Sequence, residues 1–190
     1  MLNWMAFTLR AQREANLLYG ATAMASTISV LLDVMDFCRV RTLMTLDEIA
    51  KLPDPAAVLG WRPGPGRAHI GWQLTHIGIT EELTATERML GTTPAYADLV
   101  SRFKFGSVPD DDIPSVEQIR EVLAGSRKHV LECFARFSDA DLDTIPQWYQ
   151  ERGWNIRRIL QILSWHEAHH QGQAHITFNL WKAAQPKTGA

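Results

Sequence analysis

The chain is poor in cysteine, with only Cys38 and Cys133 among its 190 residues. Two distant cysteines exclude a disulfide framework and a zinc site built on cysteines. We expect both to be buried free thiols, as is usual in a reducing compartment. Residues 1–16 place apolar residues before charged ones, the reverse of a secretory signal, so the predicted location is cytoplasmic.

Long apolar runs and an excess of one charge are missing as well. The sequence has no run of about 18 apolar residues, which argues against a membrane-spanning helix. Its 19 Lys and Arg residues nearly balance its 21 Asp and Glu residues, and the net charge is −2. Such a chain has no strong positive field to attract polyanions. We therefore expect neither nucleic acid nor a membrane as a partner.

Alternation of apolar and polar residues, the pattern of strands, is scarce. Apolar residues instead recur at steps of three and four residues, which indicates helices. The predicted helices cover residues 22–42, 70–90, 115–137 and 155–182, with a short leading helix over 4–19. Four long helices predict an all-α fold of the four-helix-bundle type, with an extra N-terminal helical segment.

Two connections interrupt this pattern. Residues 52–68 contain four prolines and three glycines, a density that argues against regular structure. Residues 91–114 form the second connection, for which we expect a short helix near 95–104 or a lid over a pocket. Residues 45–48, Thr-Leu-Asp-Glu, have the form of a capping box and are expected to start one or two turns of a new helix.

Four of the seven histidines fall within ten residues on the last predicted helix. At 100° per residue, His166 and His170 lie on one apolar stripe, whereas Ser164 lies on the opposite, polar face that we expect to meet solvent. Two neutral imidazoles one helical turn apart on an inward stripe can converge on one divalent ion. This spacing predicts a metal site inside the bundle.

A metal ion needs more than two ligands, and the helix over 70–90 offers another. His76 lies on the apolar face of that helix, so it is the predicted third ligand. His69, at the end of the Pro/Gly connection, and His129, beside charged residues, are weaker candidates. Each ligand histidine also needs a hydrogen-bond partner for its outer ring nitrogen, the one that does not bind the metal. The candidates for this role are Gln73, Thr80 and Gln173.

Two other interpretations stay open at this point. The histidines could be hydrogen-bonded core residues without a metal. His166, Glu167 and His170 also match the zinc-protease motif H-E-x-x-H, in which Glu167 would be the general base. The longer metzincin motif requires a glycine and a histidine three and six residues after His170, but Gly172 and His175 each lie one residue too early. No Asp or Glu follows Glu167 that could act as a third, carboxylate ligand, so both observations argue against a protease. Glu167 is then a catalytic base or orienting group at the edge of the stripe, or a surface carboxylate.

Two segments match the motifs of a known family: WRPGPGRAHIGWQLTHIGITEE at 61–82 and HEAHHQGQ at 166–173. They resemble the W-x-P loop, the single-histidine helix and the H-x-x-H-H-x-G-Q signature of the DinB/YfiT-like superfamily. Gln171 departs from the signature, where arginine is frequent. The resemblance covers about 22–182. The predicted limits are an N-terminal extension over 1–20, the DinB-like bundle over 21–183 and a flexible tail over 184–190.

The resemblance implies up-down-down-up connectivity and a divalent metal ion, zinc or nickel, held by His76, His166 and His170. It also implies a homodimer and a small-molecule substrate, such as a low-molecular-weight thiol, because members include metal-dependent thiol transferases and a maleylpyruvate isomerase. We therefore expect a metal-dependent transferase or hydrolase whose physiological substrate the sequence does not name. The alternative is a non-catalytic metal-binding protein of stress response or sensing.

Overall fold

The computed structural model describes residues 25–186. The predicted helix over 4–19, the extension over 1–20 and most of the tail over 184–190 lie outside these residues. Within 25–186 every regular element is helical and no strand occurs. The predicted all-α fold is therefore confirmed. No helix in this range combines the length and apolar character that crossing a membrane requires.

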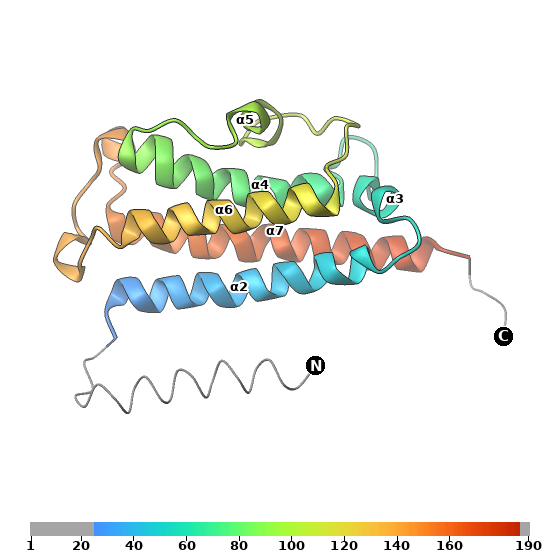
Figure 1. Cartoon of the computed structure of the whole chain (residues 1–190), viewed down its shortest axis with the longest axis horizontal. Coiled ribbons are helices and arrows are strands. Elements are labelled where there is room, and N and C mark those ends of the chain that lie inside the picture. The colour runs from blue at the N-terminus through green and yellow to red at the C-terminus, as the bar shows by residue number, and fades with distance from the viewer. Residues whose placement is uncertain (1–24, 187–190) are drawn as a thin grey trace.

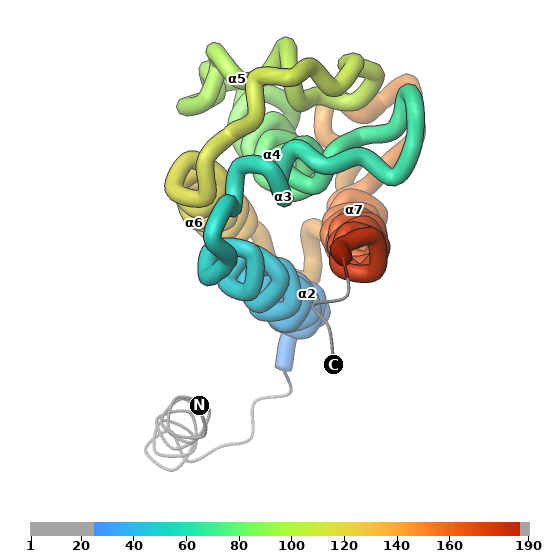
Figure 2. The backbone as a smooth tube through the Cα atoms, turned by 90° about the vertical axis from the view of Figure 1, so that its right-hand side faces the viewer, coloured from blue at the N-terminus to red at the C-terminus, as the bar shows by residue number. Residues whose placement is uncertain are grey.

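Four long helical elements form the bundle. They are α2 (Thr27–Ala50), α4 (Ile70–Leu83) with its π-helical continuation η1 (Thr84–Arg88), α6 (Val116–Phe134) and α7 (Ile156–Ala184). In Figure 1, α2 and α7 run from left to right, whereas α4 and α6 run from right to left. The view along the bundle shows the four helices around a shared interior (Figure 2). In this arrangement α4 packs on both α6 and α7, and α2 packs chiefly on α7.

Two of the long helices begin at N-cap residues that can be recognised in the sequence. Ser115 begins α6 with a capping box, because its side chain accepts from the backbone N–H of Gln118 and the Gln118 side chain accepts from the backbone N–H of Ser115. Asn155 caps α7 by accepting from the N–H of Arg158 at 2.9 Å. Both predicted starts are confirmed, and α6 ends at Phe134, three residues before the predicted end.

The predicted new helix over 45–48 is wrong, because α2 runs through these residues to Ala50. Thr45 is buried within the helix, and its hydroxyl donates to the carbonyl of Arg41 one turn earlier. Leu46 and Ile49 are fully buried in the core. Packing of these side chains therefore outweighs the capping tendency of the local sequence.

The connection over 52–68 is also more regular than predicted, since it contains the short helix α3 (Pro55–Gly60). Asp54 caps this helix by accepting from the N–H of Ala57, and Pro55 occupies its first turn, where a missing N–H costs nothing. Val58 and Leu59 then bury their side chains in the core. Proline here starts a helix rather than preventing one.

The second connection contains α5 (Ala97–Phe103), which confirms the short helix expected near 95–104. Phe103 is buried with Trp72 of α4 and Val122 of α6, so α5 covers this part of the bundle. Figure 1 shows α5 lying across the outer side of α4. The connection to α7 contains two short 3-10 helices, η2 (Asp139–Asp141) and η3 (Gln147–Arg152).

A glycine lets α4 and α6 approach closely. A Cβ atom added at Gly78 would lie 2.7 Å from a methyl carbon of Val122 and 3.2 Å from its carbonyl oxygen. His76 lies nearly opposite Gly78 around the helix, at 100° per residue. Contact of the glycine face with α6 therefore turns His76 toward α7.

Candidate metal centre

Three histidines from two helices meet in the bundle. His76 comes from α4, and His166 and His170 come from successive turns of α7. One ring nitrogen of each lies within 4.8 Å of the others, and the Nε2 atoms of His76 and His166 are 3.1 Å apart. His76 is buried, whereas His166 and His170 are half-buried. The structure thus brings together the three residues that the sequence analysis selected.

Two of the rings are held by acceptors at their outer nitrogen. The Nδ1 atom of His76 lies 2.6 Å from the backbone carbonyl of Phe103, and that of His170 lies 2.6 Å from Oε1 of Gln73. Carbonyl oxygens only accept, so each Nδ1 carries the proton and donates it. The Nε2 atom of each ring is then left with a free lone pair, which is the tautomer that a metal ligand requires.

All three imidazoles are neutral near pH 7. Burial lowers the pKa of His166 to about 2, assisted by the positive charge that His76 and His170 would carry. Burial and the neighbouring His76 lower the pKa of His170 to about 3. The pKa of His76 is also lowered, chiefly by burial. No proton therefore has to be displaced before these nitrogens bind a cation at neutral pH.

The cluster offers three protein ligands to an ion. No fourth His, Cys, Asp or Glu joins the three histidines within residues 25–186. Trp72 stacks on His76 with ring centroids 4.5 Å apart, and its Nε1–H donates to the carbonyl of Arg102 at 3.0 Å. Three imidazoles are the ligand number of catalytic rather than structural zinc sites. The donor set therefore fits a divalent ion with an accessible coordination position.

Gln73 offers a test of this arrangement. Replacing Gln73 with leucine is expected to lower the affinity for zinc or nickel about 10- to 100-fold, because the ring of His170 loses the acceptor that fixes its tautomer. Competition with a chromogenic chelator measures this affinity. The matched control is Gln161→Leu, because Gln161 is exposed on α7 and lies outside the cluster. Equal losses in both variants would contradict a specific role of Gln73.

The sequence matches the model of a known protein family. A sequence model described as the DinB superfamily matches residues 35–174, well over half of the chain. The chain belongs to the DinB superfamily. The match includes all three clustered histidines, so the site lies within the region that the superfamily defines. None of the curated proteins compared with the chain matches it.

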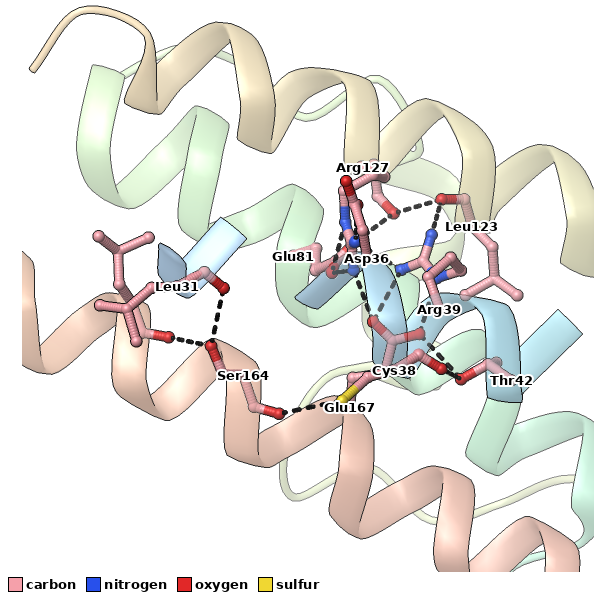
Figure 3. A network of polar contacts seen from close by, with 12 residues as sticks. Leu31, Asp36, Cys38, Arg39, Thr42, Glu81, Leu123, Arg127, Ser164 and Glu167 are labelled. Atoms are coloured by element: carbon pink, nitrogen blue, oxygen red, sulfur yellow. Dashed lines mark hydrogen bonds and ion pairs between the residues drawn. The ribbon is translucent and has the colours of Figure 1, made fainter. Parts of the chain in front are cut away.

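In this DinB-superfamily chain, Glu167 lies in a buried ion network on the side of α7 that faces α2 and α6 (Figure 3). One oxygen of Glu167 accepts from Arg39 and Thr42 at 2.7 and 2.8 Å, and the other accepts from Arg127 at 2.5 Å. Glu167 is 1% exposed, so the alternative of a surface carboxylate is wrong. Because both oxygens are engaged by α2 and α6, the arrangement favours a structural role over that of a general base.

Glu81 completes the network from α4. Its two oxygens contact Arg127 at 2.6 Å and Arg39 at 2.7 Å. Burial alone would raise the pKa of Glu81, but the two guanidinium groups outweigh burial and hold this pKa below its ordinary value. Two arginines and two glutamates therefore pair with one another beside the histidine cluster and connect all four long helices of the DinB bundle. The partly exposed Asp36 of α2 is a third carboxylate, which contacts Arg127 at 2.6 Å.

The remaining predicted residues occupy other places. Ser164 is buried against α2, where its hydroxyl donates to the carbonyl of Leu160, so its predicted exposure is wrong. This face of α7 is covered because α2 packs along it. His69 is buried as the cap of α4, and His129 pairs with Glu82 at 2.6 Å. Neither joins the cluster found within the described part of the chain.

Sequence reasoning missed two contributors to the site. The acceptor for His76 is the backbone carbonyl of Phe103, which no side-chain pattern can announce. The partners of Glu167, Arg39 and Arg127, come from other helices. The sequence did contain one signal for these partners. Glu167 lies at the edge of an apolar stripe, and a charged residue that is buried there requires a partner of opposite charge.

Proposed function

We propose that this member of the DinB superfamily binds one divalent metal ion, zinc or nickel, through His76, His166 and His170 and uses it to act on a small molecule. The observation that carries the proposal is the pair of contacts at the outer ring nitrogens of His76 and His170. Phe103 and Gln73 hold the outer nitrogens of two rings, so that lone pairs on the inner nitrogens point to a common centre. Histidines that only filled the core would need acceptors as well, but they would not have to bring one ring nitrogen each to within 4.8 Å of the others.

Each residue around the centre has a defined task in this proposal. The three imidazoles hold the ion, while Phe103 and Gln73 keep the rings oriented. Trp72 covers one face of His76 and limits access of water from that side. Glu167 braces α7 against α2 and α6 and so fixes where α7 presents His166 and His170 within the bundle. An ion bound here would supply Lewis acidity that lowers the pKa of a bound water or thiol.

Two reaction classes fit such a centre, transfer of a low-molecular-weight thiol and hydrolysis. Three neutral ligands leave the full positive charge of the ion available to a thiolate or to water. The second candidate function is non-catalytic metal binding in stress response or sensing. It would be favoured by an additional ligand filling the accessible position.

The test is a comparison of metal-loaded and metal-free protein prepared without a nickel column. Each form is supplied with low-molecular-weight thiols together with electrophiles, and separately with activated esters. We expect turnover that requires the metal and disappears with a chelator. Metal binding without turnover of any substrate class would favour the non-catalytic function, and a failure to bind metal would refute both.

We also propose that the protein forms a homodimer and that it is located in the cytoplasm. The dimer is supported by apolar side chains on the outer face of α2, where Phe37 is 69% exposed. A patch of this kind is typical of a surface that another protein covers. Light scattering on the full chain measures the mass in solution, for which we expect twice that of one chain.

A further inference from the structure

Among the residues that the structure describes, one arginine of the helix that carries His76 has no counter-ion. Arg88 ends the π-helical turn η1 that continues α4. Its Nε atom is buried and has no hydrogen-bond partner within residues 25–186. Arg39 and Arg127 pair with buried carboxylates, whereas Arg88 has no carboxylate partner in the described part of the chain. A buried N–H without an acceptor is costly unless a ligand supplies one.

The π turn aims Arg88 at the site. In a continuous α-helix Arg88, twelve residues after His76, would lie roughly 120° from it around the axis. A π turn holds one extra residue and sets the following residues back by roughly 100°. Arg88 therefore comes nearly into line with His76, about 18 Å further along the axis, and its long side chain points back toward the start of the helix, which leaves a gap that a small molecule can span. Turns of this kind occur often at functional sites.

The electrostatics agree with this placement. The pKa values of His76 and His166 are lowered mainly by burial, but the positive charge of Arg88 lowers both further. Aromatic packing also fixes the side chain, because the guanidinium carbon of Arg88 lies 4.8 Å from the ring centroid of Trp148. Arg88 is thus held in place before any ligand arrives.

We propose that Arg88 binds a carboxylate on a small substrate whose other end reaches the metal centre. The proposal rests on the proposed function and names the class of its substrate. A guanidinium presents a planar set of N–H donors that matches a carboxylate. One carboxylate also balances the single positive charge of Arg88. Selectivity then arises from Arg88, and activation arises from the metal.

The test uses protein loaded with cobalt(II), whose visible spectrum reports ligand binding at the metal. The probes are mercaptoacetate, 3-mercaptopropionate and 4-mercaptobutyrate, each compared with an uncharged hydroxy-thiol of matching length. We expect the wild type to bind one of the acids about tenfold or more tightly than its neutral counterpart, since a charge-assisted hydrogen bond contributes this much.

Three variants locate this preference. Arg88→Met keeps the packing on Trp148, and we expect it to lose the preference while retaining cobalt and the neutral thiol. Arg88→Lys keeps the charge and is expected to retain part of the preference. The matched control is Arg152→Met, because Arg152 also lies over the ring of Trp148, at 5.1 Å, but is exposed. This variant is expected to behave as the wild type.

Two results would overturn the proposal while leaving the metal site intact. One is equal affinity of the wild type for acids and neutral thiols, a comparison that needs no variant to fold. The other is a preference that survives in Arg88→Met. Failure of the wild type to bind cobalt would instead overturn the proposed function and this inference together, so the two failures are distinguishable.

Discussion

Replacement of His166 by alanine is expected to lower the affinity for zinc or nickel by at least about a hundredfold. His166 contacts both other members of the cluster, with its Nε2 atom 3.1 Å from that of His76 and its ring centroid 4.5 Å from that of His170. Removal of a group behind a ligand already costs about 10- to 100-fold, so loss of a ligand itself costs more. Competition with chelators of graded affinity measures the change.

The same substitution separates metal binding from folding. An ion that binds only the folded state stabilises it, by about 4 kcal/mol when free metal exceeds the dissociation constant a thousandfold. We therefore expect zinc to raise the melting temperature of the wild type but not that of His166→Ala. The metal-free variant should fold as well as the metal-free wild type, because it removes a desolvated imidazole that lacks a cation.

His175→Ala is the matched control for this experiment. His175 lies on the same helix but is exposed and outside the cluster, so the variant should bind metal as the wild type does. If His166→Ala retained the wild-type metal affinity, the three-histidine site would be refuted. If both variants lost affinity equally, the effect would reflect α7 as a whole.

Replacement of Glu81 by glutamine is expected to reduce the free energy of unfolding by about 3–5 kcal/mol, because Arg39 and Arg127 lose the buried carboxylate that pairs with both of them. Glu81 is 2% exposed and contacts both Arg39 and Arg127. Its neutral replacement cannot balance two guanidinium groups in the interior. Denaturation with urea, followed by circular dichroism, measures the loss.

The loss should depend on pH in one direction. The pKa of Glu81 in the folded protein lies below its ordinary value, despite burial, because Arg39 and Arg127 stabilise the ionised form. The carboxylate therefore adds stability at pH values above the unfolded pKa, about 4.3, and this contribution is lost as the pH falls through the lower folded pKa. The difference between wild type and Glu81→Gln should be full at pH 7 and shrink below about pH 4.

A surface ion pair supplies the control for this prediction. Glu132 contacts Lys128 at 3.8 Å, and both side chains are largely exposed. Glu132→Gln should change the free energy of unfolding by less than about 0.5 kcal/mol. A loss of under about 1 kcal/mol for Glu81→Gln, independent of pH, would contradict the account of the buried network.

The parts of the fold that the sequence predicted are those that local rules determine. Periodic apolar residues located the four long helices, and the side chains of Ser115 and Asn155 marked two of their starts. The selection of His76, His166 and His170 succeeded because each shares a helical face with core residues. A histidine on such a face requires a partner wherever the neighbouring helices lie.

The parts that the sequence did not predict depend on the arrangement of the bundle. Glu167 could not be assigned to a buried network until α2 and α6 were known to bring Arg39 and Arg127 to it. The continuation of α2 through Thr45 depends on core packing rather than on its capping tendency. The π turn that redirects Arg88 has no compositional signature, because nothing in Thr-Ala-Thr-Glu-Arg distinguishes it from an α-helical segment.

The central claim is that three imidazoles share one divalent ion. Its most direct test is anomalous scattering, recorded at the zinc and nickel edges, from crystals of protein purified without a nickel column. We expect a single peak at bonding distance from His76, His166 and His170, together with a coordination position occupied by a ligand from solvent. Crystals grown with added zinc or nickel that show no peak between these histidines would contradict the account.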